Sequence, residues 1–295
     1  MNTLYRNKPA IIVFLLPALV LFVGIIIIPI IMSAYYSLHD WNGFTEMKFI
    51  GLDNYIELFT NKAVNFPKAL SNAVLYAGIS LAVQMPLSLL LALLLAKKRR
   101  GSRFFLSVYF FPVLMSTVVI GQLWLKIYNP DYGILNVALN SIGLDSWAHV
   151  WLGDRSTALL STFIPTMWQY TGYHMLLLYA GINSVPQEIQ EAALIDGASE
   201  WQVNRKIIIP LLKPVLRVCI IISVTGSLKV FDLIYILTNG GPAHATEVPS
   251  TLLVDMLFLR NRYGFGSSIA VLLIFLCFLF AIIFRKTFKT EDELK

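Results

Sequence analysis

The chain has 295 residues, of which 57% are hydrophobic and only 14% are charged, and its formal net charge is +6. Soluble domains carry roughly a quarter of charged residues, so the composition excludes an ordinary water-soluble domain. The positive charge does not indicate a nucleic-acid partner, because the basic residues stand beside long apolar stretches, as membrane orientation requires. We therefore expect an integral membrane protein.

Six apolar stretches are long enough to cross a bilayer as helices, which takes about 20 residues. Backbone groups inside lipid have no water to bind, so each stretch is expected to be helical. The expected spans are residues 10–38, 69–96, 104–128, 157–182, 215–237 and 267–284. The first is longer than the apolar core of a signal peptide, about 7–15 residues, so we expect it to be retained. The prediction is an all-α, polytopic membrane protein with one domain over residues 1–295.

Basic residues predict the orientation of these spans, because cytoplasmic connections are enriched in lysine and arginine. The connection at 97–103 holds five cations in seven residues, whereas the loop at 129–156 holds one arginine and three aspartates. Further cations contribute to the prediction near both ends of the chain, at Arg6, Lys8, Arg285, Lys286 and Lys289. Both ends are therefore expected on the cytoplasmic side of the membrane.

The common catalytic motifs are missing from the sequence, which has no GxxxxGKS/T phosphate loop, HExxH zinc motif or GxSxG nucleophile motif. The histidines are scattered and the two cysteines stand alone in apolar stretches. We therefore expect no catalytic residue, no metal site and no cofactor bound by this chain. Ionisable groups inside the expected spans are also few, which counts against a transporter driven by an ion gradient.

The connection between the fourth and fifth expected spans, residues 181–214, carries strong local signals. Pro186 suits the start of a helix, and Gly197 is placed to end it. Ser199 and Gln202 have the spacing of a capping box, so a second helix is expected to begin there. The product is a short helix, a sharp turn and a second helix.

The first of these two helices has a face of small and apolar residues. Ile189, Ala192 and Ala193 are spaced so that they lie on or near one side. Small side chains there allow another surface to approach closely. From the residues alone, the segment is either an amphipathic connector lying on the bilayer or a docking element.

The same connection resembles the EAA motif of ABC importer permeases. Its matching positions are Glu191-Ala192-Ala193, then Gly197 after three residues, Ile207 after nine more, and Ile209-Pro210 after one more. The usual motif has leucine where Ile209 stands, a mild departure. Segments 231–242 and 49–55 extend the resemblance to the carbohydrate-uptake permeases related to the maltose transporter, specifically to their six-span first permease.

The resemblance implies the ABC type I importer permease fold in a bacterial cell membrane, and half of a translocation path for a sugar or oligosaccharide. It implies a second permease subunit, related but different, beside this one in the lipid. It also implies two cytosolic ATPase subunits, which would hold ATP and Mg, and an extracytoplasmic solute-binding protein that delivers the sugar. In that family the connection at 181–214 is the coupling helix, which docks on an ATPase subunit. The docking residues would be Glu191, Ala192, Ala193, Asp196, Gly197 and Ala198.

The sugar path is expected to be lined by polar and aromatic residues near mid-membrane. The fourth span offers Thr166, Gln169, Tyr170 and Tyr173, and the fifth offers Ser223 and Ser227. The alternative for these residues is helix–helix packing, which also uses buried polar and small side chains. Lys229 and Asp232 either have a structural role, paired with each other or with the second permease, or belong to the path.

Three alternatives to a sugar permease remain open. One is an ABC permease for a solute such as glycerol phosphate, for which Lys229 is the one candidate cation. Another is an ion-driven secondary transporter, which has no use for an EAA connection. The third is a membrane scaffold, against which the polar mid-span positions argue.

Overall fold

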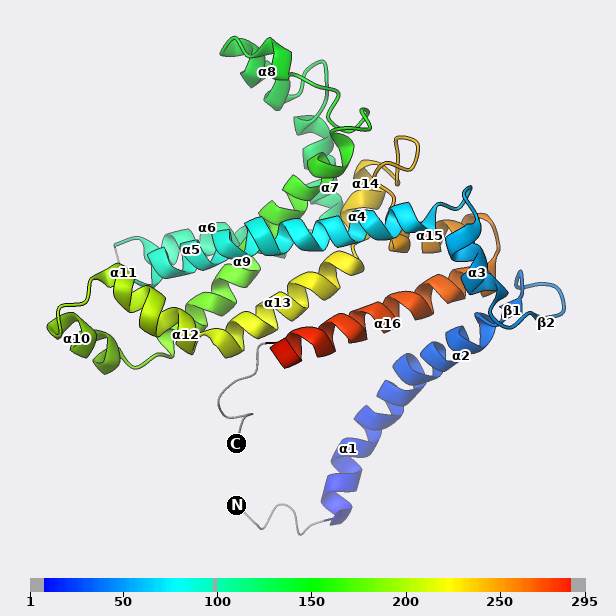
Figure 1. The fold of residues 1–295 in the computed structure, drawn as a ribbon, viewed down its shortest axis with the longest axis horizontal. Coiled ribbons are helices and arrows are strands. Elements are labelled where there is room, and N and C mark those ends of the chain that lie inside the picture. The colour runs from blue at the N-terminus through cyan, green and yellow to red at the C-terminus, as the bar shows by residue number, and fades with distance from the viewer. Residues whose placement is uncertain (1–7, 98–99, 288–295) are drawn as a thin grey trace. The chain divides into compact units, whose positions relative to one another are not determined.

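The computed structural model describes residues 8–97 and 100–287 (Figure 1). Several cations used to predict the orientation, namely Arg6, Lys98, Arg99 and Lys289, lie outside these described residues. Within them the chain is helical, as predicted, apart from a small antiparallel ladder that pairs β1, His39–Asp40, with β2, Lys48–Phe49. The chain divides into two compact units, one of Met1–Asn65 with Leu253–Ile274 and one of Phe66–Leu252 with Phe275–Lys295.

The first unit contains the N-terminal helices and the start of the last helix. Its elements are α1 (Lys8–Phe22), the π-helical turn η2 (Val23–Ile27), α2 (Ile28–Tyr36), β1, β2, α3 (Asp53–Thr60), the π-helical turn η6 (Asp255–Leu259) and the first part of α16 (Tyr263–Thr287). Helix α15 (Pro249–Val254) leads into it from the second unit.

The second unit holds the remaining elements. They are α4 (Phe66–Ile79), the π-helical turn η3 (Ser80–Gln84), α5 (Met85–Ala96), α6 (Ser102–Leu114), α7 (Thr117–Ile127), α8 (Ile134–Ser141), the short 3₁₀ turn η4 (Asp145–Trp147), α9 (Ala158–Asn183), α10 (Gln187–Ile195), α11 (Glu200–Val203), the π-helical turn η5 (Asn204–Ile208), α12 (Ile209–Leu211), α13 (Lys213–Leu228) and α14 (Asp232–Leu237).

Four helical stretches of the described chain are long and apolar enough to cross a membrane: Ile12–Tyr36, Phe66–Ala96, Lys213–Leu237 and Tyr263–Thr287. A fifth is obtained if α6 and α7 together form one broken span. These four stretches and the α6–α7 pair match five of the six expected spans. The expected fourth span matches α9, which is long enough at 26 residues but too rich in polar side chains to qualify by composition. Six spans therefore stays a prediction.

The expected third span is not one straight helix. Helix α6 ends at Leu114, Met115 and Ser116 have extended backbone, and α7 follows at an angle of 97°. Pro112 lies one turn before the break and cannot donate a backbone hydrogen bond. The apolar run from 104 to 128 continues through the bend, so hydrophobicity alone gave no sign of it.

Three of the π-helical turns share a sequence signal, which is a proline two residues after the turn ends. The turns are η2, η3 and η5, and the prolines are Pro29, Pro86 and Pro210. Proline lacks an N–H, and its ring clashes with the carbonyl four residues earlier. A wider π turn before the proline relieves that clash without ending the helix, and such turns are common at functional sites.

Helix α9 packs against both α5 and α6 in the second unit. At the α6 contact, Gly172 lies so close to the backbone of Tyr109 that a Cβ atom would collide with its carbonyl oxygen. The absence of a side chain at 172 is therefore what lets these two helices cross closely, as small residues do in membrane helix packing.

We predict that Gly172→Ala destabilises the protein by about 1–3 kcal/mol, the usual cost of forcing atoms into a packed core. The measurement is the thermal unfolding midpoint of the detergent-solubilised protein. Gly78→Ala is the matched control, because a Cβ at this helical glycine meets nothing within 4 Å. An equal midpoint for Gly172→Ala and wild type would contradict the close crossing.

An ion pair stabilises the first unit by joining α3 to the residue that precedes α16. The guanidinium of Arg262 donates two hydrogen bonds to the carboxylate of Glu57, at 2.9 and 2.6 Å. These bonds hold the pKa of Glu57 below its ordinary value and raise the pKa of Arg262. Asn54 also stabilises this unit, because its side-chain amide donates hydrogen bonds to the carbonyls of Ser37 and His39.

The Glu57–Arg262 pair predicts an acid-dependent loss of stability. Because the folded pKa of Glu57 is lowered, its contribution is present above the ordinary Glu pKa of about 4.3 and is lost as pH falls through the lower folded value. The pair is partly exposed, so we expect Glu57→Gln to cost at most about 1 kcal/mol at pH 7. The difference from wild type should shrink as pH falls below that ordinary value.

The check is the unfolding midpoint of both proteins across this pH range. Glu46→Gln, which removes an exposed carboxylate from the same unit, serves as the control and should leave the midpoint unchanged at every pH. A Glu57→Gln difference that does not shrink at acid pH would show that the effect is not the ion pair.

Candidate functional site

A cavity of about 460 Å³ lies within the second unit, among α4, η3, α9, α13 and the break between α13 and α14. All the residues predicted for the path line it, although they come from two expected spans. They are Thr166, Gln169, Tyr170, Tyr173, Ser223, Ser227, Lys229 and Asp232. Whether each contacts a transported molecule stays a prediction, but the fold brings all of them to one place.

Helix α9 provides the longest wall of this cavity. Its predicted residues follow at three- and four-residue spacing, which keeps them on one face. Phe163 and His174 extend that face by one position at each end and also line the cavity. Gln169 and His174 are buried, whereas Tyr170 is 40% exposed, so the wall combines deep polar groups with accessible aromatic ones.

The break between α13 and α14 brings two charges to the cavity. Helix α13 ends at Leu228 and α14 begins at Asp232, so Lys229 and Asp232 flank an irregular turn. Both are exposed in the chain, and within the described residues no ion pair joins them. Together they leave the cavity lining without net charge.

Sequence reasoning missed the wall formed by α4 and η3. Tyr76, Ser80 and Gln84 line the cavity and are all buried. Their spacing of four residues inside an otherwise apolar span was the signal that would have found them. The π turn at Ser80–Gln84 could not be foreseen from that spacing.

Hydrogen bonds between neutral side chains join the helices around the cavity. The Tyr76 hydroxyl donates to Thr162 at 2.8 Å, and the hydroxyls of Ser80 and Ser223 lie 2.6 Å apart. Ser88 on α5 donates to the carbonyl of Thr171 on α9. The cavity walls are therefore tied to one another and not merely packed.

The predicted coupling segment has the expected local structure. Helix α10 begins at Gln187, so Pro186 occupies the N-cap position and not the first helical position as predicted. Gly197 has a φ of +84°. A side chain is costly at such a φ, which accounts for glycine at this turn. Ser199 and Gln202 form both hydrogen bonds of the predicted capping box at the start of α11.

The predicted docking residues divide into an exposed and a packed set. Glu191, Ala192, Asp196 and Gly197 are exposed, while Ala193 and Ala198 pack against the core made by α5, α9 and α13. The two inner alanines thus hold the segment against the helices and leave the outer residues free for another surface. Their docking role stays a prediction.

A charged contact ties the same segment to the end of α5. The amine of Lys97 lies 2.5 Å from the carboxylate of Glu200, the first residue of α11. A hollow of about 520 Å³ lies nearby, between the ends of α5 and α9 and the exposed Glu191 of α10. Glu191 accepts a hydrogen bond from Gln187, which directs its carboxylate along the helix surface.

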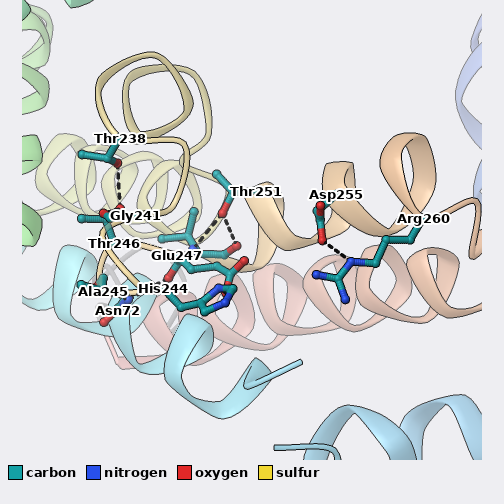
Figure 2. A network of polar contacts seen from close by, with 11 residues as sticks. Asn72, Thr238, Gly241, His244, Ala245, Thr246, Glu247, Thr251, Asp255 and Arg260 are labelled. Atoms are coloured by element: carbon teal, nitrogen blue, oxygen red, sulfur yellow. Dashed lines mark hydrogen bonds and ion pairs between the residues drawn. The ribbon is translucent and has the colours of Figure 1, made fainter. Parts of the chain in front are cut away.

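The loop that follows α14 is held in place by side-chain hydrogen bonds, as Figure 2 shows. The side-chain amide of Asn72 on α4 donates to the carbonyls of Ala245 and Glu247, at 3.0 and 2.7 Å. Thr238 and Thr246 join the two ends of the loop through their hydroxyls at 2.7 Å. A single buried amide therefore fixes a turn 173 residues away in sequence, which nothing in the sequence indicated.

Comparison with known families gives one match that covers most of the chain. The model of the binding-protein-dependent transport system inner membrane component matches residues 84–288. Among curated proteins, the probable ABC transporter permease protein YurN of Bacillus subtilis is 42% identical over 98% of this chain and 99% of its own length. The trehalose/maltose transport system permease protein MalF of Thermococcus litoralis is 34% identical over 96% of this chain and 94% of its own.

Solved structures share the fold at lower sequence identity. A chain of the bacterial alginate ABC transporter, in complex with a periplasmic protein that carries an alginate pentasaccharide, superposes with a TM-score of 0.84. The two chains are 22% identical, and the match covers 97% of each. At that identity the likeness concerns the fold alone.

Proposed function

Because the chain belongs to the family of binding-protein-dependent transport system inner membrane components, and is thus a permease subunit of an ABC importer, we propose that it forms half of a translocation path for a sugar or oligosaccharide. The observation that carries the proposal is the cavity of the second unit, whose lining combines hydroxyl, amide and aromatic side chains. Such a lining suits sugars, which present hydroxyls around apolar ring faces. The relative named for trehalose and maltose supports the same substrate class.

The proposed topology has six spans with both ends in the cytoplasm. In it, α9 is a span whose polar face lines the cavity, and the bent pair α6–α7 is one broken span. The segment at 181–214 then lies on the cytoplasmic side, together with the basic connection at 97–103. The loop that Asn72 pins lies on the opposite side.

The proposed mechanism depends on partners that bring the energy and the substrate. A solute-binding protein presents the sugar, a second permease completes the cavity, and two cytosolic ATPases bind ATP and Mg. The exposed edge of α10 docks on one ATPase, so closure of the ATPase pair pulls α10. Because Ala193 and Ala198 pack on the helices that form the cavity, the pull reaches those helices and biases them between two arrangements.

The first test of this proposal is assembly and stimulation. We expect the chain to copurify with an ATPase and a second permease when they are co-expressed. In proteoliposomes, sugar-loaded binding protein should raise ATP hydrolysis and drive uptake of labelled sugar. Failure to copurify with any ATPase, or uptake that follows a proton or sodium gradient, would contradict the proposal. Uptake of glycerol phosphate but no sugar would favour the other substrate.

The second test addresses the docking edge of α10. Glu191→Lys reverses the exposed charge, and Gly197→Pro removes the positive φ that the turn requires. We expect either change to lower ATPase copurification by about tenfold or more, the effect of losing at least 1.4 kcal/mol of binding. Membrane insertion, measured by the yield of folded chain, should be unaffected.

Gly143→Pro is the matched control for the glycine variant. Gly143 also has a positive φ, and like Gly197 it has no atom within 4 Å of a Cβ position. It lies in the loop at 129–156, which the proposed topology places on the other side of the membrane. Normal ATPase copurification with Gly197→Pro and Glu191→Lys would disprove docking through α10.

A further inference from the structure

Three side chains that line the cavity carry buried polar atoms that find no partner in the protein. Within the described residues, the buried side-chain atoms without a hydrogen bond include Nε2 of Gln84, Oε1 of Gln169 and Nδ1 of His174. All three side chains line the cavity and are at most 4% exposed. An unpaired buried polar group costs about 1–3 kcal/mol, so three around one cavity indicate that a ligand pairs with them.

The orientation of Gln84 follows from its neighbours. Ser80 donates its one hydroxyl hydrogen to Oε1 of Gln84 at 2.5 Å. The hydroxyl of Ser223, 2.6 Å from that of Ser80, must then be the donor of their shared bond. This chain of bonds fixes the carbonyl end of the Gln84 amide and leaves its two N–H donors unused.

The local backbone explains how these groups reach the cavity together. Ser80 and Gln84 are the first and last residues of the π-helical turn η3. A π turn changes the angular register of a helix, and such turns are frequent at functional sites. The proline at 86 that favours the turn is therefore linked to the placement of the amide.

We propose that Gln84 and His174, together with Gln169, form a second polar wall that binds hydroxyl groups of the transported molecule and selects for them. The inference rests on the proposed sugar function and adds residues to it. A sugar hydroxyl both donates and accepts, so it can pair with the amide N–H of Gln84 and with the carbonyl oxygen of Gln169. The imidazole nitrogen of His174 serves as donor or acceptor according to its tautomer.

The chemistry of these side chains also determines which ligands the wall excludes. Its bonded groups are hydroxyls and amides without formal charge, and Lys229 and Asp232 stand at the α13–α14 break. A charged ligand group placed among Gln84, Gln169 and His174 would lose its hydration without a counter-ion there, which is costly. A ligand lacking a hydroxyl would leave the wall unpaired, and sites built for a substrate hydroxyl reject such analogues strongly.

The test uses the complete importer in proteoliposomes, with binding protein saturated by either the transported sugar or a deoxy analogue. Gln84→Leu removes the amide, and His174→Phe removes the ring nitrogens while leaving the Ser80–Ser223 bonds intact. We expect each variant to lower the uptake rate for the sugar by about tenfold, the equivalent of one neutral hydrogen bond. The preference for the sugar over its deoxy analogue should fall by a similar factor.

Copurification of the ATPase should stay close to that of wild type in these variants, because the docking edge of α10 is untouched. Gln122→Leu is the matched control, since it removes the same amide from an exposed position on α7 outside the cavity lining. It should change neither the uptake rate nor the preference.

The outcomes separate this inference from the proposed function. If wild type takes up sugar while Gln84→Leu and His174→Phe keep its rate and its preference, the wall binds only water and the inference is wrong. If Gln84→Leu does not assemble, His174→Phe decides alone by the same criterion. If wild type takes up no sugar at all, the proposed function itself fails.

Discussion

The hydrogen bonds between neutral side chains on different helices are the interaction on which the cavity depends. Apolar packing alone gives membrane helices little reason to prefer one arrangement, because lipid tails are as apolar as leucine. The bonds of Tyr76 with Thr162 and of Ser80 with Ser223 fix α4 and η3 against α9 and α13. The close crossing at Gly172 adds α6 to this group. Gln84, Gln169 and His174, which keep polar atoms without a partner, line the same cavity, so the residues that build its walls are also the proposed binding groups.

Helix α9 connects the cavity with the proposed docking segment. Its middle turns carry Gln169 and His174, and its last turns, with Met175 and Leu178, enter the core on which Ala193 and Ala198 pack. The helix spans 26 residues, so one element joins the two regions directly. In the proposed mechanism, a displacement of α10 changes the position of the cavity wall, which is what coupling transport to a partner's ATP hydrolysis requires.

Sequence reasoning found the features that depend on neighbouring residues. Apolar length located the helices, the Ser199–Gln202 spacing gave the capping box, and the turn at Gly197 followed from glycine chemistry. The bend at Met115 and Ser116 was missed because the apolar run hides it, and the wall at Gln84 was missed because partners on other helices decide its role. The path residues on α9 and α13 were predicted from polarity, but their convergence on one cavity with residues of α4 depends on tertiary packing.

The composition of α9 explains both its failure to qualify as an apolar span and its place in the proposed topology. Its buried residues include Thr162, Gln169 and His174, whereas its exposed residues include Leu160, Ile164 and Trp168 at four-residue spacing. Over this part of the helix, polar side chains are buried and an apolar stripe is exposed, the reverse of a helix on the surface of a soluble protein. An apolar outer stripe suits contact with lipid, and polar residues in a span face the interior or a water-filled cavity. The polarity that lowers the hydropathy of α9 is therefore what a span lining a sugar path requires.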